Sequence, residues 1–171
     1  MIDFLSYIKV AIFFTILFST GVVIIKRAIS ENRAQVLLPA GSIFGICLYI
    51  FLLNLTAHLI KGIPGFLFAL LLQIILTFLI TRLIPTSPLT FPKGKEAKIW
   101  IFLLFFWVVF LYQITAHATT DGADSTLHQS FAARFIRGDY PMHTPWQPDY
   151  IAYYHFGGAQ LLGSLHALTG A

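Results

Sequence analysis

Four long apolar runs, separated by short polar connections, dominate the chain. They cover residues 4–25, 36–60, 64–84 and 97–118. The last run reaches about 20 residues only if its ends, through Ala97 and Ala118, are included. A helix needs about 20 predominantly apolar residues to cross the hydrocarbon core of a bilayer. We therefore predict that each run forms one transmembrane helix.

Small residues in two places predict close helix packing. Gly41 and Gly45 form a GxxxG pair, which either seats another helix or reflects only the frequency of small residues in membrane helices. In residues 151–171, Ala159, Gly163 and Ala167 recur every four residues. We predict a fifth membrane helix there. Because the chain ends directly after it, we expect the N-terminal part of a longer protein.

The composition also indicates a membrane protein. Hydrophobic residues make up 57% of the chain and charged residues 11%, with a mean hydropathy of +0.79. Soluble domains carry about 25% charged residues. We predict an all-α integral membrane protein, a multi-spanning bundle of about five helices with an extracytoplasmic loop that contains a short amphipathic helix. The only cysteine, Cys47, can form no intramolecular disulfide.

The distribution of basic residues predicts the orientation in the membrane, and we assign the positive net charge to this topology rather than to nucleic-acid binding. Cytoplasmic loops of membrane proteins keep an excess of Lys and Arg. The connections after the first and third runs hold Lys26, Arg27, Arg33, Arg82, Lys93, Lys95 and Lys98, whereas the opposite turn has only Lys61. We expect the N-terminus and residues 121–150 to lie outside, in a multi-pass protein of a bacterial plasma membrane.

The long polar stretch 121–150 predicts the extracytoplasmic loop. Residues 125–137 suit a short interfacial helix, with Asp124 as its N-cap and Gly138 as its stop. One half of this helix would be apolar and the other polar. The apolar half contains Leu127, Phe131, Ala132, Phe135 and Ile136. The polar half contains Gln129, Ser130, Arg134 and Arg137.

Asp124 and His128 also fall on the apolar half of that helix. A carboxylate and an imidazole on a dry face need a partner, a cavity or a chemical task. The alternative is a capping aspartate that hydrogen-bonds its neighbour. The proline-rich residues 138–149 that follow are acceptable at membrane depth only if they line a cavity. Nearby aromatic side chains suit either a sugar ring or the interfacial aromatic belt: Tyr140, Trp146, Tyr150, Tyr153 and Tyr154.

These residues carry a resemblance to a known family. The chain has Asp124 with His128 four residues later, then Ile-Arg-Gly-Asp-Tyr-Pro at 136–141, and Tyr-Tyr-His-Phe-Gly at 153–157 before a helix. This pattern resembles the first outer loop of GT-C type membrane glycosyltransferases. It is most similar to bacterial members with a YYY or YHYG signature and more distantly to protein mannosyltransferases. The likeness covers about residues 121–170.

The resemblance implies a transferase that moves a sugar from a polyprenyl-phosphate donor to an acceptor on the outer side. The acidic loop motif of the family falls on Asp124. Many members have two adjacent acidic residues there, whereas this chain has Ser125 next. Asp121 is either the second carboxylate or only a loop residue. The Tyr-Pro part of the family pattern matches Tyr140 and Pro141.

The chemistry of such a transfer assigns roles to these residues. A general base must accept the proton of the attacking hydroxyl, and Asp124 is our first candidate. Arg134 or Arg137 either meets the charge of the leaving polyprenyl phosphate or contacts only lipid headgroups. The candidate substrate-binding residues are His128, Arg134, Arg137, Tyr140, Trp146, Tyr153, Tyr154 and His155. A divalent metal ion held by Asp121 and Asp124, with His117 or His128, is a further hypothesis.

Two other classes stay open. A transporter or a non-catalytic membrane component of envelope assembly would place polar groups along a path through the bilayer. The first four runs contain few ionisable residues away from their ends, which speaks against this class. A haem or quinone protein would use His58 and His117 on facing helices, and both lie near the outer ends of their runs.

Overall fold

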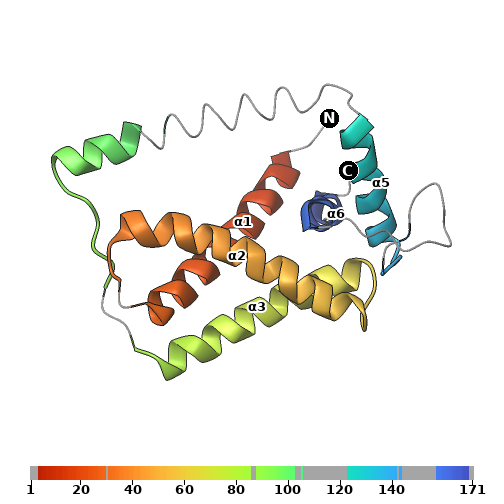
Figure 1. The fold of residues 1–171 in the computed structure, drawn as a ribbon, viewed down its shortest axis with the longest axis horizontal. Helices are drawn as coiled ribbons and strands as arrows, with labels where there is room; N and C mark the ends of the chain where they lie inside the picture. The colour runs from red at the N-terminus through yellow and green to blue at the C-terminus, as the bar shows by residue number, and fades with distance from the viewer. Residues whose placement is uncertain are drawn as a thin grey trace.

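The computed structural model describes residues 4–29, 31–85, 88–102, 105, 123–141, 143 and 157–169. The chain forms the helices α1 (Phe4–Ala28), α2 (Ala34–Ala57), α3 (Ile63–Leu83), α5 (Ala123–Ile136) and α6 (Gly157–Thr169), shown in Figure 1. Residues 95–102 are also helical. In the part of the chain that the structure describes, the predicted all-α class is confirmed.

Helices α1, α2 and α3 are long and apolar enough to cross a membrane. They match the first three predicted spans within a few residues. Large apolar side chains face outward along them, including Ile12, Ile43, Phe51 and Phe78, each more than half exposed. Such faces suit contact with lipid rather than water. Of the fourth predicted span, residues 97–102 and 105 are helical, and the rest lies outside the described residues.

Glycines bring α1 and α2 into backbone contact. A Cβ atom built on Gly45 would overlap the carbonyl oxygen of Leu17. One built on Gly21 would overlap the carbonyl oxygen of Gly41 and lie 2.6 Å from the amide nitrogen of Gly45. The Gly41 and Gly45 pair therefore seats a neighbouring helix, the first of the two readings that the sequence left open, and the neighbour is α1.

A buried amide joins α3 to the other two helices. Gln73 is fully buried, and its Nε2 donates to Thr20 Oγ1 at 2.6 Å and to the carbonyl oxygen of Gly45 at 3.3 Å. The Oε1 atom of Gln73 accepts no hydrogen bond from the described residues. One side chain thus fixes α1, α2 and α3 relative to one another in the middle of their length.

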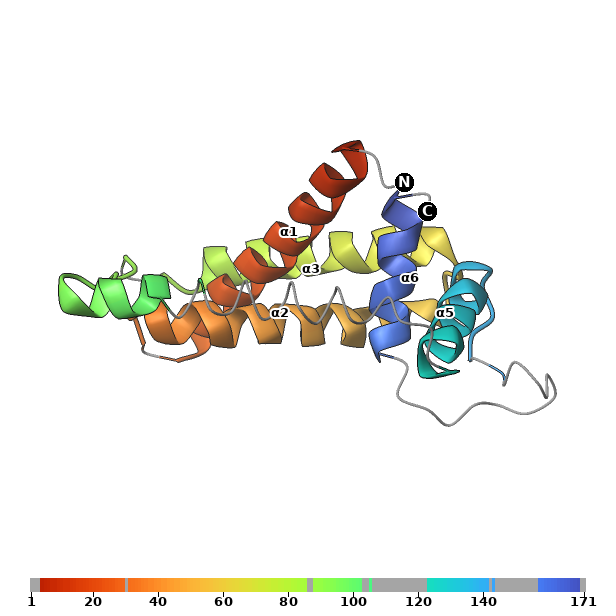
Figure 2. The same cartoon turned by 90° about the horizontal axis from the view of Figure 1, so that it is seen from above.

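Helix α6 crosses α2 and α3 steeply and does not run alongside them (Figure 2). Of its predicted small residues, Ala159 and Gly163 are buried and Ala167 is half-buried against the core. A Cβ on Gly163 would lie 3.4 Å from the carbonyl oxygen of Ala132 on α5. The helix has 13 residues and is thus about 20 Å long, too short on its own to span a membrane. The predicted fifth span over residues 151–171 therefore stays a prediction, and residues 151–156 lie outside the described residues.

The two basic connections meet at one end of the bundle. Arg27 Nε, at the end of α1, donates to the carbonyl oxygen of Ile84, just after α3, at 3.0 Å. Arg33 and Thr90 form an isolated parallel β-bridge between the same two connections. The turn between α2 and α3 lies at the opposite end, next to α5 (Figure 1). This shared end is the arrangement that the positive-inside rule requires of the two basic loops.

Candidate functional site

The candidate site lies where α5 ends against the turn between α2 and α3. The apolar half of α5 faces inward as predicted, with Phe131, Ala132 and Phe135 at most 3% exposed. The ring of Phe135 stacks on that of Phe66 at the start of α3, with centroids 5.3 Å apart. Gln129 and Arg137 of the polar half are exposed. This burial fixes the direction in which the residues after α5 leave the helix.

The C-terminus of α5 is closed by a Schellman motif. Gly138 has a φ of +87°, its N–H donates to the carbonyl oxygen of Phe135 at 3.0 Å, and the N–H of Asp139 donates to that of Arg134 at 3.1 Å. Glycine adopts this left-handed conformation without a steric penalty. The predicted stop at Gly138 is confirmed.

The N-terminus of α5 differs from the prediction. The helix begins at Ala123, so Asp124 lies in its first turn and is not the N-cap. Alanine has the highest helix propensity, which favours extending the helix back to residue 123. A carboxylate in the first turn also interacts favourably with the positive end of the helix dipole. The backbone positions of Asp124 and His128 are on α5, while their side chains lie outside the described residues.

A second glycine lets the two segments of the site approach each other. Gly62, in the turn before α3, has a φ of +67°, and a Cβ on it would lie 2.7 Å from the carbonyl oxygen of Ile136. A Cβ on Gly138 would lie 3.1 Å from the Cβ of Lys61. The end of α5 is therefore held directly against the α2–α3 turn.

Asp139 is the centre of a charged cluster just beyond this cap. Its Oδ2 lies 3.1 Å from Nη1 of Arg134, and its Oδ1 lies 2.7 Å from Nδ1 of His143. All three side chains are between a quarter and about a third exposed. Partial burial raises the pKa of Asp139, but hydrogen bonds from His143 and Arg134 outweigh this effect and hold the pKa below its usual value. The carboxylate is therefore ionised at neutral pH.

Tyr140 connects the cluster to the interior. Its hydroxyl donates to Oδ1 of Asn54 at 2.9 Å, and its ring packs edge-on against His58 and Phe135. Burial raises the pKa of the phenol. Asn54 and Gln160 exchange two amide hydrogen bonds, of 2.6 and 3.1 Å, between α2 and α6. The hydroxyl of Tyr140, a predicted substrate-binding group, is thus engaged within the protein.

The structure brings together only some of the predicted site residues. Arg134 belongs to the Asp139 cluster, and Tyr140 follows Asp139 directly in the chain. Arg137 is exposed, with its Nε donating to the carbonyl oxygen of Ala133 at 3.3 Å. Several predicted residues lie outside the described residues: Asp121, Trp146, Tyr153, Tyr154, His155 and His117. No three His, Cys, Asp or Glu side chains of the described part form a group that could hold a metal ion. The metal site at Asp121 and Asp124 stays a prediction.

Sequence reasoning missed Asp139, His143, Asn54 and Gln160. Asp139 and His143 have the same four-residue separation as Asp124 and His128, which was a usable signal. Asn54 is an amide inside an apolar run, where burial without a partner is costly, so a partner could have been expected. The identity of that partner could not have been predicted, because Gln160 is 106 residues away along the chain.

The Asp139 and His143 pair can move a proton. A carboxylate that accepts from Nδ1–H of an imidazole fixes its tautomer and orientation and leaves Nε2 as the reactive nitrogen. No described residue forms a hydrogen bond to Nε2 of His143, whose side chain is 34% exposed. The site therefore combines an oriented imidazole, an arginine and a partly buried aromatic ring. The chain matches no protein-family model, no curated protein and no solved structure.

Proposed function

We propose that the chain is part of a membrane glycosyltransferase that transfers a sugar from a polyprenyl-phosphate-linked donor to an acceptor on the extracytoplasmic side. The resemblance of residues 121–170 to the outer loop of GT-C type enzymes supports this proposal. Three helices suited to cross a bilayer support contact with a lipid-borne donor. In this proposal the N-terminus and the Asp139 cluster both lie outside.

The cluster of Arg134, Asp139 and His143 is the observation that carries the proposal. It lies at the end of the bundle opposite the basic loops, beside the exposed Arg137. The backbone of Asp124 is ten residues before Arg134 on the same helix, a rise of about 15 Å. A donor bound along α5 could therefore contact a carboxylate near one end of the helix and cationic groups near the other.

Each group has a proposed task. Asp124, supported by Asp121, accepts the proton of the acceptor hydroxyl as the oxygen attacks the anomeric carbon. Arg137 meets the leaving phosphate better than Arg134 does, because Asp139 already balances the charge of Arg134. His143, oriented by Asp139, is a second group able to take up or supply a proton. Trp146, Tyr153, Tyr154 and His155 are proposed to contact the sugar or the donor.

The test is the release of polyprenyl phosphate, because it requires neither the sugar nor the acceptor to be known. Membranes that contain the full-length protein would be incubated with a panel of polyprenyl-phosphate hexoses and pentoses and with extracytoplasmic extract, and the free polyprenyl phosphate would be measured by mass spectrometry. We expect release from one donor that depends on the protein and on the extract. Absence of release from every donor would favour the transporter or non-catalytic class.

A further inference from the structure

The end of the bundle away from the candidate site carries a second feature, which the glycosyltransferase proposal does not use. The connections after α1 and α3 are joined there by backbone hydrogen bonds. The N–H of Ala34 donates to the carbonyl oxygen of Thr90, and the N–H of Thr90 donates to that of Asn32, both at 2.8 Å. Thr90 Oγ1 also donates to the carbonyl oxygen of Asn32 at 3.0 Å. The two loops therefore form one fixed surface.

The three arginines at this end are already engaged. Arg27 donates to backbone carbonyl oxygens, and Arg82 lies over the ring of Phe78, 5.0 Å from its centroid. Arg33 donates to both carboxylate oxygens of Glu31, with a shortest distance of 2.7 Å. The hydrogen bond from Arg33 lowers the pKa of Glu31 to about 2, so this pair stays ionised.

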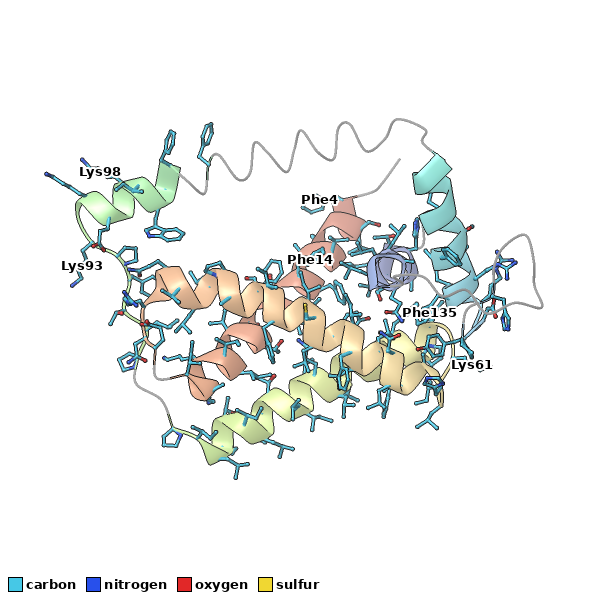
Figure 3. The ribbon with its side chains drawn as sticks, viewed as in Figure 1. Phe4, Phe14, Lys61, Lys93, Lys98 and Phe135 are labelled. Atoms are coloured by element: carbon cyan, nitrogen blue, oxygen red, sulfur yellow. The ribbon has the colours of Figure 1, made fainter. Side chains whose placement is uncertain are left out.

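Three lysines at the same end differ from these arginines. Lys93, Lys95 and Lys98 are exposed and form no ion pair with the described residues. Glu96 lies among them, so residues 91–102 carry a net charge of 3 − 1 = +2. Figure 3 shows Lys93 and Lys98 projecting at one end of the molecule and Lys61 at the other.

Large apolar side chains are exposed beside these lysines. Phe91, Ile99, Ile101 and Phe102 are each more than half exposed, and Trp100 is 37% exposed. In water this exposure would be unfavourable, whereas at a bilayer surface aromatic and aliphatic groups enter the acyl region and lysines reach the headgroups. A groove of about 500 Å³ opens next to them, with a lining that includes Arg33, Gln35, Thr90, Phe91, Lys93 and Glu96.

We propose that this surface binds the headgroup of an anionic phospholipid, with the phosphate at Lys93, Lys95 and Lys98 and the acyl chains along Phe91 and Trp100. Uncompensated lysines beside exposed aromatic groups match both parts of such a lipid. Each lysine near an anionic membrane surface is expected to give on the order of a fivefold preference for anionic over zwitterionic lipid. The surface would anchor the basic end of the bundle at the cytoplasmic leaflet.

Quenching of Trp100 fluorescence tests the proposal. The chain with Trp107→Phe and Trp146→Phe, which leaves Trp100 as the reporter, would be placed in phosphatidylcholine nanodiscs. These would contain equal mole fractions of spin-labelled phosphatidylglycerol or spin-labelled phosphatidylcholine. We expect an association constant at least fivefold higher for phosphatidylglycerol. The triple variant Lys93→Gln, Lys95→Gln and Lys98→Gln should bring the ratio close to one, and replacement of the same lysines by arginine should keep it high.

Lys61→Gln is the matched control, because it removes one exposed lysine at the opposite end of the bundle, and the preference should not change. Equal quenching by the two lipids in the parent chain would overturn the proposal, as would a preference that survives the triple glutamine change. Loss of the preference on addition of 10 mM inorganic phosphate at constant ionic strength would indicate a site for soluble phosphate instead. None of these results depends on sugar transfer.

Discussion

Replacement of Gly45 by alanine tests the contact on which the bundle is built. The added Cβ would overlap the carbonyl oxygen of Leu17 and lie 2.8 Å from its carbonyl carbon and 3.4 Å from the Cα of Gly21. These are backbone atoms of a helix, so no side-chain rotation can relieve the overlap. Helix α1 must move away from α2, and the hydrogen bond from Gln73 to the carbonyl oxygen of Gly45 is disturbed with it.

The expected magnitude follows from two opposing terms. Overpacking of a tight contact costs about 1–3 kcal/mol, and a backbone overlap belongs at the upper end of that range. Alanine in place of glycine stabilises a helix by about 1 kcal/mol. The free energy of unfolding should therefore fall by about 2 kcal/mol, or roughly thirtyfold in the folding equilibrium.

Unfolding in mixed micelles, followed by far-UV circular dichroism as the mole fraction of dodecyl sulfate rises, measures this change. Gly158→Ala is the matched control, because a Cβ at that position meets no atom of the described residues within 4 Å. Gly158 is the second residue of α6, so this change should stabilise the protein by no more than about 1 kcal/mol and should not destabilise it. If Gly45→Ala unfolds at the same detergent composition as Gly158→Ala, the close contact between α1 and α2 is refuted.

Three further predictions concern the candidate site and the topology. Asn54→Ala should lower the free energy of unfolding by about 1–3 kcal/mol in the same assay, since it leaves the fully buried Gln160 without its partner. The double variant Asn54→Ala with Gln160→Leu should recover part of that loss. If the double variant is no more stable than Asn54→Ala, the amide pair is contradicted. Asp139 has a lowered pKa, so its contribution is present above the unfolded-state pKa of about 3.9 and is lost as the pH falls through the folded value. The stability difference between the parent chain and Asp139→Asn should thus shrink as the pH falls below about 4, whereas a difference that persists in strong acid would oppose the ionised cluster. In a Cys47→Ser background, a cysteine that replaces the exposed Arg137 should react with an impermeant maleimide in intact cells. A cysteine that replaces the exposed Lys95 should react only after permeabilisation. The reverse pattern would invert the orientation.

The sequence predicted the features that depend on local pattern. The three long helices follow from apolar runs, and the buried face and the stop of α5 follow from helical periodicity and Gly138. Close packing was only one of two interpretations of Gly41 and Gly45. A small-residue motif does not determine which helix packs against it, so the contact of α2 with α1 could not be predicted.

The features that were not predicted depend on distant parts of the chain. The steep crossing of α6 is fixed by contacts such as Tyr49 with Ser164, whose hydroxyls are 2.9 Å apart and whose positions differ by 115 residues. The cluster around Asp139 forms only after Gly138 reverses the chain direction, and this reversal brings Asp139 back beside Arg134. Hydrophobic periodicity describes one face of one helix and carries no information on contacts between that helix and other parts of the chain.

Sugar transfer by the full-length Asp124→Asn variant tests the central claim most directly. Asparagine keeps the shape of the side chain and its hydrogen-bonding oxygen but loses the basicity that deprotonates an acceptor hydroxyl. The release of polyprenyl phosphate from the active donor should fall to background, while expression, membrane insertion and the unfolding transition stay close to those of the parent protein. Release at the parent rate by Asp124→Asn would contradict the assignment of Asp124 as the base.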